Sequence, residues 1–395
     1  MILVWIALVM LVLALVCGLT AAVTIRFASW QSFPSFCSTR RRPEEEGGLP
    51  VVMYHDVESD MFERELAFLK SNKYETITAD ALVAWLNGQA GRLPERPIVL
   101  TFDDGHTSLW TDAYPLLKRY GYQAIAFVCP WWIPESSLPR GPRNPRYPLN
   151  YCASWQELRE MDSAGVINVQ SHTHSHNQIW VDPMVRTFMT PDYRCRYIWW
   201  DDGPTPPEQP DPPWGWPILT HCPRFAHPRR FFPDTAVMRA CAEHVAEHGG
   251  LAFFARKNWQ DELWTVLGGG APPFELPGRW ETPDEQRAAL GEDLKKAKRT
   301  LEEQLDKPVE HLAFPWNEAS SLAISLAGEV GYRSVFRGVL NDRDLTQLGD
   351  DPMHIPRVTA GSFQQNVLSL PGRGRRGPAL MMAWKIVRGL QRRLR

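Results

Sequence analysis

Short apolar segments that alternate with helical segments restrict the fold of this 395-residue chain more than any other feature. Seven segments have the length and composition of buried strands, at residues 50–54, 97–102, 123–129, 166–170, 311–314, 334–336 and 354–358. Helical patterns lie among them, at residues 63–69, 79–86, 109–120, 155–164 and 282–305. Alternation of this kind is typical of parallel βαβ units. We therefore predict an α/β fold, a distorted (β/α) barrel of about seven parallel strands that is closed or nearly closed.

Residues 177–279 interrupt this alternation, because neither periodicity is strong there. The stretch 201–217 is rich in proline and contains Trp214 and Trp216. Tryptophan stacks on sugar rings and also fills cores, and the sequence leaves both roles open. We predict a long Pro/Trp-rich insertion in a domain that spans residues 49–360, and we expect it to shape a substrate groove.

The N-terminal end of the chain indicates a membrane anchor. Residues 1–25 carry no charged side chain and exceed the roughly 20 apolar residues that cross a bilayer. A cleaved signal peptide is the alternative, since small residues at 20–22 form a weak cleavage site. Arg26 and the arginines at 40–42 lie in the linker at 26–48, and the positive-inside bias then predicts a single-pass inner-membrane protein with its domain on the cytoplasmic face.

The C-terminal segment 361–395 is strongly basic. From Arg373 onward it has eight cations and no acid, with apolar residues at helical spacing. This pattern predicts an amphipathic helix on anionic lipid, and a solvated tail is the alternative. The formal net charge of the whole chain is only −2, which gives no sign of a nucleic-acid partner.

Polar residues follow several of the predicted strands. Because the chemistry of such barrels lies at the C-terminal ends of the strands, these residues are candidates for one site. They are His55, Asp103, Asp104, His172, Pro315 and Trp316.

Two of these strand ends suit a metal ion. Asp103 and Asp104 project to opposite sides of an extended chain, so one can bind a cation, although an Asp-Asp-Gly turn is the simpler explanation. His172 and His176 share a face if the chain takes one helical turn, whereas a continued strand would align them with His174. Two imidazoles and a strand-end aspartate would leave a coordination position open, as catalytic metal sites do. None of the seven cysteines forms a C-x-x-C pair, so a cysteine zinc site is not expected.

The motifs resemble those of the polysaccharide deacetylase family, also called the NodB homology domain or carbohydrate esterase family 4. Thr101–Gly105 matches its first motif, the run 171–176 contains its second, and Phe314-Pro315-Trp316 resembles its third, which lines the groove. The resemblance implies that Asp104, His172 and His176 hold a divalent metal, with zinc as the expected ion, and that Asp103 is the catalytic base. The arginine that usually precedes the proline of the third motif is missing, so the residue that orients Asp103 is not evident.

An early motif narrows the resemblance. Met53-Tyr54-His55-Asp56-Val57 resembles a motif of the poly-N-acetylglucosamine deacetylases, which implies His55 as the catalytic acid. His354 is the late alternative.

The activity that the resemblance implies is metal-dependent removal of an N-acyl group, above all N-acetyl, from an amino sugar in a polysaccharide or lipid-linked glycan. The alternatives are a glycan-binding protein that has the fold without catalysis, and a hydrolase of linear amides that are not sugars. Family members that trim extracellular polymers work outside the cytoplasmic membrane, so the periplasmic or extracellular face is the alternative to the side favoured by the arginines.

Overall fold

A computed structural model describes most of the chain. Its described residues are 48–89, 91–135, 152–193, 198, 212–226, 228–269, 274–338 and 345–359. Within these ranges no helix has the length and apolar character needed to span a bilayer. The predicted anchor at 1–25, the linker up to residue 47 and the basic tail at 361–395 lie outside the described residues.

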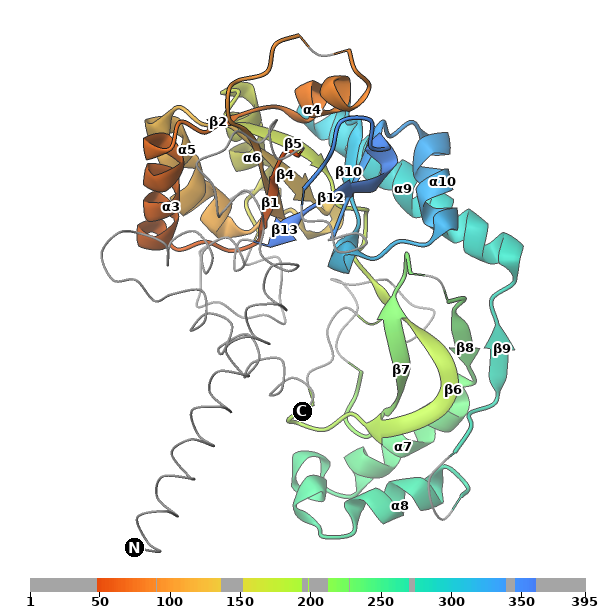
Figure 1. Ribbon diagram of the computed structural model, residues 1–395. Helices are drawn as coiled ribbons and strands as arrows, with labels where there is room; N and C mark the ends of the chain where they lie inside the picture. Colours follow the sequence, from red (N-terminus) through yellow and green to blue (C-terminus); the bar gives the residue numbers. More distant parts are fainter. Residues whose placement is uncertain are drawn as a thin grey trace, which may run out of the picture.

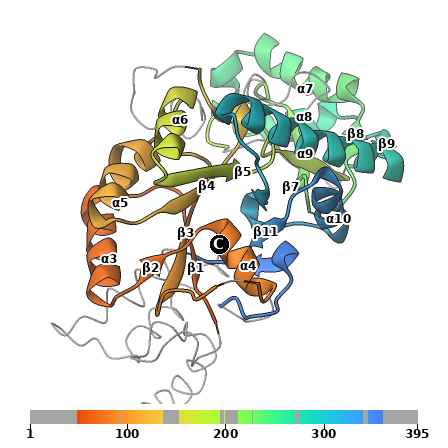
Figure 2. The same cartoon turned by 90° about the horizontal axis from the view of Figure 1, so that it is seen from above.

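Parallel strands form one curved sheet around a central axis (Figures 1 and 2). In spatial order they are β12 (Ile355–Pro356), β11 (Ser334–Arg337), β10 (His311–Ala313), β5 (Ile167–Ser171), β4 (Ala124–Val128), β3 (Pro97–Asp103), β1 (Val51–Tyr54) and β13 (Val358–Thr359). A two-residue strand, β2 (Glu75–Thr76), also pairs with β3. The predicted strands are confirmed.

The last strand segment closes the sheet. β12 pairs with β11, whereas β13 pairs with β1 at the other edge, and only Arg357 lies between β12 and β13. If this segment is counted as one strand, seven parallel strands surround the axis, and the prediction of a nearly closed barrel is confirmed. The barrel is distorted between β5 and β10, which share the single register pair Ser171 and Leu312.

Helices cover the outside of the barrel. They are α3 (Ser59–Ser71), α4 (Ala79–Leu86), a π-helical turn (Leu109–Ala113) continuing into α5 (Tyr114–Tyr120), α6 (Trp155–Ser163), α9 (Pro283–Leu305) and α10 (Ser321–Val330). The five predicted helices are confirmed, and α9 begins with a capping box between Thr282 and Glu285. Helix α10 was not predicted, because no helical pattern was recognised between the two strands that flank it.

Side-chain alternation along the strands separates two layers of core. Val51, Val99, Phe127 and Phe336 belong to the smaller cluster, which fills the barrel interior. Their neighbours on the strands point outward to the helices and form the larger cluster. Asp103 has the same parity as Val99, so β3 directs its carboxylate to the interior end of the barrel.

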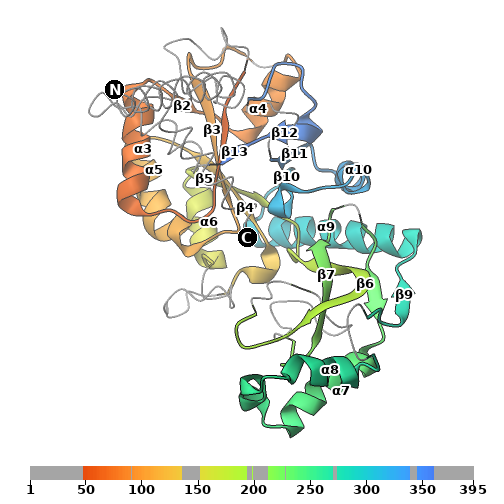
Figure 3. The ribbon, with the colours of Figure 1, turned by 60° about the horizontal axis from the view of Figure 1, so that its bottom comes forward.

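The chain between β5 and α9 forms a second lobe beside the barrel (Figures 1 and 3). It contains β6 (Gln178–Phe188), β7 (Pro217–Pro223), β8 (Phe231–Pro233), α7 (Thr235–Glu247), a 3-10 helix (Gly250–Ala255), α8 (Trp259–Val266) and β9 (Gly278–Trp280). The antiparallel pair β6 and β7 packs with α7 and α8 around a separate hydrophobic core.

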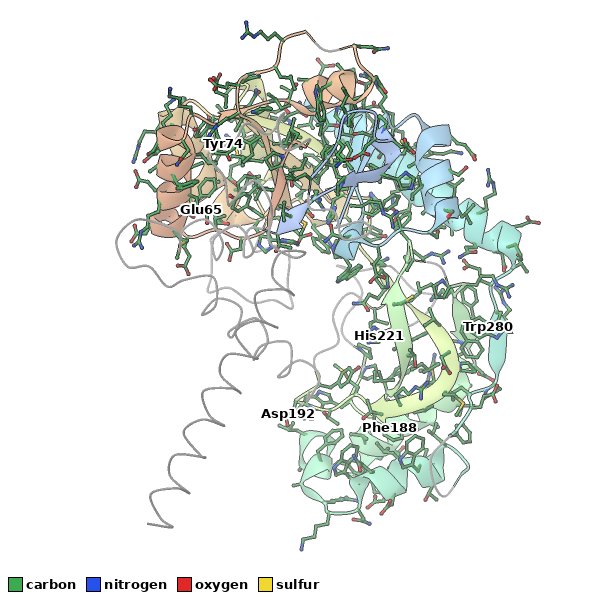
Figure 4. All side chains as sticks on the ribbon, in the orientation of Figure 1. Glu65, Tyr74, Phe188, Asp192, His221 and Trp280 are labelled. Atoms are coloured by element: carbon green, nitrogen blue, oxygen red, sulfur yellow. The ribbon has the colours of Figure 1, made fainter. Side chains whose placement is uncertain are left out.

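The tryptophans of this lobe lie partly in its core and partly on its surface. Trp180, Trp216 and Trp264 are buried in the lobe core. Trp214 and Trp280 each expose 42% of their surface, and Trp280 stands on the outer edge of the lobe, away from Phe188 in the core (Figure 4).

A neck joins the lobe to the barrel, and we define it as residues 224–226 and 228–230 together with Glu281. Arg224 donates two hydrogen bonds to the Glu281 carboxylate, at 2.9 and 2.5 Å, and both side chains are at most 5% exposed. The Phe225 ring lies 5.2 Å from that of Phe314, and its carbonyl accepts from the Ser320 amide. The buried ion pair therefore joins the two chain segments of the neck, and Phe225 makes the contacts with the barrel.

Candidate active site

The backbone directs the two adjacent aspartates to different places. Asp103 ends β3 in extended conformation, whereas Asp104 has φ 70° and Gly105 has φ 69°. A Cβ on Gly105 would lie 2.9 Å from a methyl carbon of Val128, so the turn needs glycine there. The turn sends Asp103 into the barrel and Asp104 toward the strand end of β5.

Asp104, His172 and His176 converge. Oδ1 of Asp104 lies 3.3 Å from Nε2 of His172 and 3.5 Å from Nε2 of His176. The three ligand atoms lie within 4.8 Å of one another. Ligands about 2.0–2.2 Å from a tetrahedral ion are themselves about 3.4 Å apart, so the spacing suits one metal ion.

Two further observations test whether these residues fit a metal. Oδ1 of Asp104 is buried and accepts no hydrogen bond from the described residues, which is costly unless a cation lies beside it. Nδ1 of His172 lies 2.8 Å from the Ala313 carbonyl oxygen, to which it donates. That bond leaves the Nε2 lone pair of His172 directed at Asp104, as in a metal ligand with a fixed tautomer. The donor set therefore fits a divalent ion.

The segment from His172 to His176 has a conformation that the sequence did not predict. It is neither a helical turn nor a continued strand, and Thr173 and His176 have φ values of 66° and 50°. Asp293 of α9 holds the bend, accepting from the His174 amide at 2.7 Å and from the Ser175 hydroxyl at 2.5 Å. Both conformations considered from the spacing are thus wrong, although the two histidines meet.

Strained backbone is concentrated at this end of the barrel. The described residues include seven non-glycine positions with positive φ, and five of them are here: Asp104, Thr173, His176, Trp316 and Asn317. Such conformations cost about 1–3 kcal/mol each and cluster at functional sites.

Arg357 is the residue that orients Asp103. Its guanidinium donates to both carboxylate oxygens, at 2.6 and 2.7 Å, and the pair is almost completely buried. Asn317 accepts a further bond from Arg357 at 2.8 Å. Burial raises the pKa of Asp103, but the charge of Arg357 outweighs burial and lowers that pKa below its usual range. The Asp103 carboxylate therefore stays ionised, and Arg357, between β12 and β13, provides an arginine where the third motif lacks one.

The sequence contained a signal for Arg357 that was not used. A lone arginine stands between Pro356 and Val358 in an otherwise apolar strand. A charged side chain in a buried strand requires a buried partner of opposite charge.

Asp104 and His176 have pKa values suited to metal ligands. Burial lowers the pKa of His172, but the carboxylates of Asp103 and Asp104 outweigh burial and raise that pKa while no ion is bound. Burial raises the pKa of Asp104, but the imidazoles of His106, His172 and His176 lower it well below its usual range. Burial lowers the pKa of His176 to about 4, so its ring is neutral near pH 7 and its nitrogen is available to a metal.

The remaining candidate residues differ in their distance from the metal site. His55 is exposed at the end of β1, and its charge contributes to the lowered pKa of Asp103. His354 precedes β12, at the opposite end of the barrel, and pairs with Asp351. Pro315 is buried, whereas Trp316 is 37% exposed with its ring 4.1 Å from that of His176. The structure thus brings Trp316 to the metal site and places His55, but not His354, at the same barrel end.

Comparisons with known proteins agree with this geometry. Residues 90–193 match the model of the polysaccharide deacetylase family. The chain is 29% identical over 146 residues to YxkH of Bacillus subtilis (strain 168), a protein named for polysaccharide deacetylases, covering 35% of this chain and 47% of that protein. It is 27% identical over 156 residues to the poly-beta-1,6-N-acetyl-D-glucosamine N-deacetylase of Escherichia coli (strain K12), covering 34% of this chain and 22% of that enzyme.

The deacetylase domain of BpsB from Bordetella bronchiseptica shares the fold, with a TM-score of 0.50, 18% identity and coverage of 79% of this chain and 95% of that one. The resemblance read from the motifs is confirmed over residues 90–193, which match the polysaccharide deacetylase family. The chain spans less than half the length of these two curated relatives.

Proposed function

We propose that this protein is a metal-dependent N-deacetylase that removes the acetyl group from an amino sugar in a glycan. The convergence of Asp104, His172 and His176 beside an ionised, arginine-held Asp103 carries the proposal. A glycan-binding protein without catalysis would have no need to keep, next to two imidazoles, a buried carboxylate oxygen that accepts no hydrogen bond from the described residues.

The substrate class is supported by the relatives. The Escherichia coli relative is named for poly-β-1,6-N-acetyl-D-glucosamine. The half-exposed Trp316 offers a ring on which a sugar can stack beside the metal site. Both points favour an N-acetylglucosamine-containing polymer or lipid-linked glycan over an amide that is not a sugar.

The chain's own side chains divide the reaction between them. Asp104, His172 and His176 would hold the ion, with zinc as the expected metal, and its chemistry is to polarise the acyl carbonyl and lower the pKa of a water. Asp103 takes the proton from the attacking water while Arg357 holds its carboxylate in place. His55 donates a proton to the leaving amine from the open rim of the barrel.

Acetate release from N-acetylglucosamine oligomers by the full-length protein tests the proposal. We expect turnover with added zinc or another divalent ion, loss of turnover after chelation, and no acetate from simple linear amides. If the metal-loaded protein released acetate from none of the glycans tested, the proposal that it is a deacetylase would be overturned. Equal turnover of linear amides would overturn the sugar specificity.

We also propose that the protein is held at the inner membrane by residues 1–25 and by its basic tail on anionic lipid, with the barrel on the cytoplasmic side. The absence of charge in 1–25 and the arginines that follow support this orientation. Fluorescent-protein and alkaline-phosphatase reporters fused to the C-terminus test it. Activity of the phosphatase fusion alone would place the domain on the outer side.

A further inference from the structure

Two buried cysteines lie beside the metal ligands. Cys129 follows β4 directly, and Cys152 stands two residues before the residue that caps α6. Sγ of Cys129 donates to the His172 carbonyl at 3.2 Å. Sγ of Cys152 donates to the Asp104 carbonyl at 3.5 Å. Each thiol thus binds the backbone of one residue of the candidate metal site.

The Cys129 thiol takes the place of a missing hydrogen bond of the sheet. β4 and β5 are neighbouring parallel strands (Figure 2), and the His172 amide donates to the Val128 carbonyl at 2.9 Å. Since Cys129 is still extended, with φ −94° and ψ 107°, the next bond of the ladder would run from the amide of residue 130 to the His172 carbonyl. Residue 130 is proline, which has no N–H. The Cys129 thiol therefore supplies a donor that the backbone lacks.

The Cys152 thiol lies against the turn that directs Asp104. The chain at Cys152 pairs antiparallel with His106, and the Ala153 amide donates to the Gly105 carbonyl at 2.9 Å. Asp104 has a positive φ, a conformation that costs about 1–3 kcal/mol and persists only where surrounding contacts fix it. The thiol and this backbone pairing together hold the turn.

Backbone movement at a ligand residue also moves its side chain. Asp104 and Thr173, the residue after His172, both have positive φ, so each ligand stands at a strained point of the chain. A metal ion tolerates only about 0.2 Å of deviation in its ligand distances. A buried thiol keeps its proton near neutral pH, so its S–H group can donate to a carbonyl.

We propose that the Cys129 and Cys152 thiols are positioning groups that hold two metal ligands in the geometry needed to bind the ion. Cys129 acts on His172, and Cys152 acts on Asp104. Each thiol acts through the backbone of a ligand residue and not as a ligand itself. The inference rests on the proposed function, because the ion concerned is the one that deacetylation requires.

The zinc affinity of the full-length protein tests this inference. Cys129→Ala removes the donor and should weaken zinc binding about 10-fold, the lower end of the range for groups that orient metal ligands. Cys129→Ser keeps a donor and should retain most of the affinity. Cys152→Ala should weaken binding less, because its hydrogen bond is longer. Competition with a chromogenic chelator measures the dissociation constants, and urea unfolding of the metal-free variants measures their stability.

Cys241→Ala is the matched control. Cys241 is also a buried free cysteine, and its Sγ donates to the Leu263 carbonyl at 3.9 Å, but it lies in the core of the lobe. Its substitution removes a thiol from a core without touching a ligand residue. We expect it to lower stability and to leave zinc affinity unchanged.

A second variant restores the missing backbone donor. Pro130→Ala in the Cys129→Ala background provides an N–H where the parallel ladder has none. Zinc affinity should then return toward the wild-type value. A loss of packing at Cys129 would not be repaired in this way, so recovery separates positioning from structural support.

Three results would overturn the inference: unchanged zinc affinity in both cysteine-to-alanine variants at the site, an equal loss in Cys241→Ala, or an equal loss in Cys129→Ser without recovery through Pro130→Ala. Zinc affinity is measured separately from acetate release. A protein that binds zinc but releases no acetate would overturn the deacetylase and leave the role of the thiols to be judged by the affinities. Absence of zinc binding to the wild-type protein would overturn both.

Discussion

Two buried arginine–carboxylate pairs hold this molecule together, one at the barrel mouth and one at the neck of the lobe. Arg357 with Asp103 and Arg224 with Glu281 are alike in geometry, since each pair makes two short hydrogen bonds and is almost completely buried. Their surroundings differ. Glu281 also accepts from the Arg230 amide, so backbone atoms complete its hydrogen bonding. Asp103 instead neighbours strained backbone and the Asp104–histidine cluster.

The difference teaches that a buried ion pair does not by itself mark a catalytic site. Burying two charges is expensive, and the pair serves structure wherever the remaining hydrogen bonds are satisfied within the protein. Function is indicated by what stands beside the pair. At the barrel mouth that neighbour is the Asp104 Oδ1, which accepts no hydrogen bond from the described residues, and at the neck it is the Arg230 amide, which donates to Glu281.

The largest expected effect is on kcat, which should depend on Asp103 and not on Glu281. Asp103→Asn should reduce kcat for acetate release by roughly 10²–10⁴-fold, because the amide cannot accept the proton. Glu281→Gln, the matched change at the neck, should leave kcat of the folded protein near wild type. Steady-state kinetics at saturating metal measure both. Comparable kcat losses in the two variants would contradict the comparison.

Removal of either arginine should lower the stability of the fold, but only removal of Arg357 should also change the ionisation of Asp103. Arg357→Met and Arg224→Met each leave a buried carboxylate without its cation, which costs roughly 3–5 kcal/mol in the free energy of unfolding. Of these two variants, only Arg357→Met should also raise the pKa of Asp103, since Arg357 contributes most among the groups that lower it.

Because Asp103 must be ionised to act, the acid limb of the kcat/KM profile of Arg357→Met should move to higher pH. Denaturant unfolding and pH profiles check the two effects. An unshifted acid limb in this variant would show that Arg357 does not set the ionisation of the base.

Metal binding should stabilise the protein, and this gain should depend on residues at the barrel mouth and not on residues of the neck. Zinc at 100 times its dissociation constant should raise the stability of the wild-type protein by about 2.7 kcal/mol. Asp104→Asn should abolish most of this gain, whereas Glu281→Gln should retain it. Thermal unfolding with and without zinc measures the difference, and an undiminished zinc shift in Asp104→Asn would exclude Asp104 as a ligand.

The smallest expected effect lies at the helix that begins next to the neck. Thr282 caps α9 through the Glu285 amide, and Thr282→Ala should cost about 1 kcal/mol of stability. The rate should not change, although α9 also carries Asp293, because the cap lies three turns from that residue. Unfolding in urea and a kcat measurement test this, and a large fall in kcat would show that the end of α9 is coupled to the histidine segment.

Much of the barrel and some of the site could be predicted because their signals are local. Apolar runs such as 97–102 define strands by burial on both faces, and the capping box of α9 is contained in four residues. The motif residues Asp104, His172 and His176 were recognised by type and spacing. The fold of the lobe was not predicted, because its strands are irregular and its core assembles from segments far apart in the chain.

The sequence by itself determined the elements of the barrel and the identity of the residues at its strand ends, because periodicity and motif spacing are properties of short stretches. Only the tertiary structure decided that Arg357 meets Asp103, 254 positions earlier in the chain, and that left-handed residues bring His176 back to His172. Both outcomes depend on closure of the barrel by β12 and β13 and on Asp293 of α9. A contact of this kind forms only when distant elements pack, so its energy is not present in any local segment.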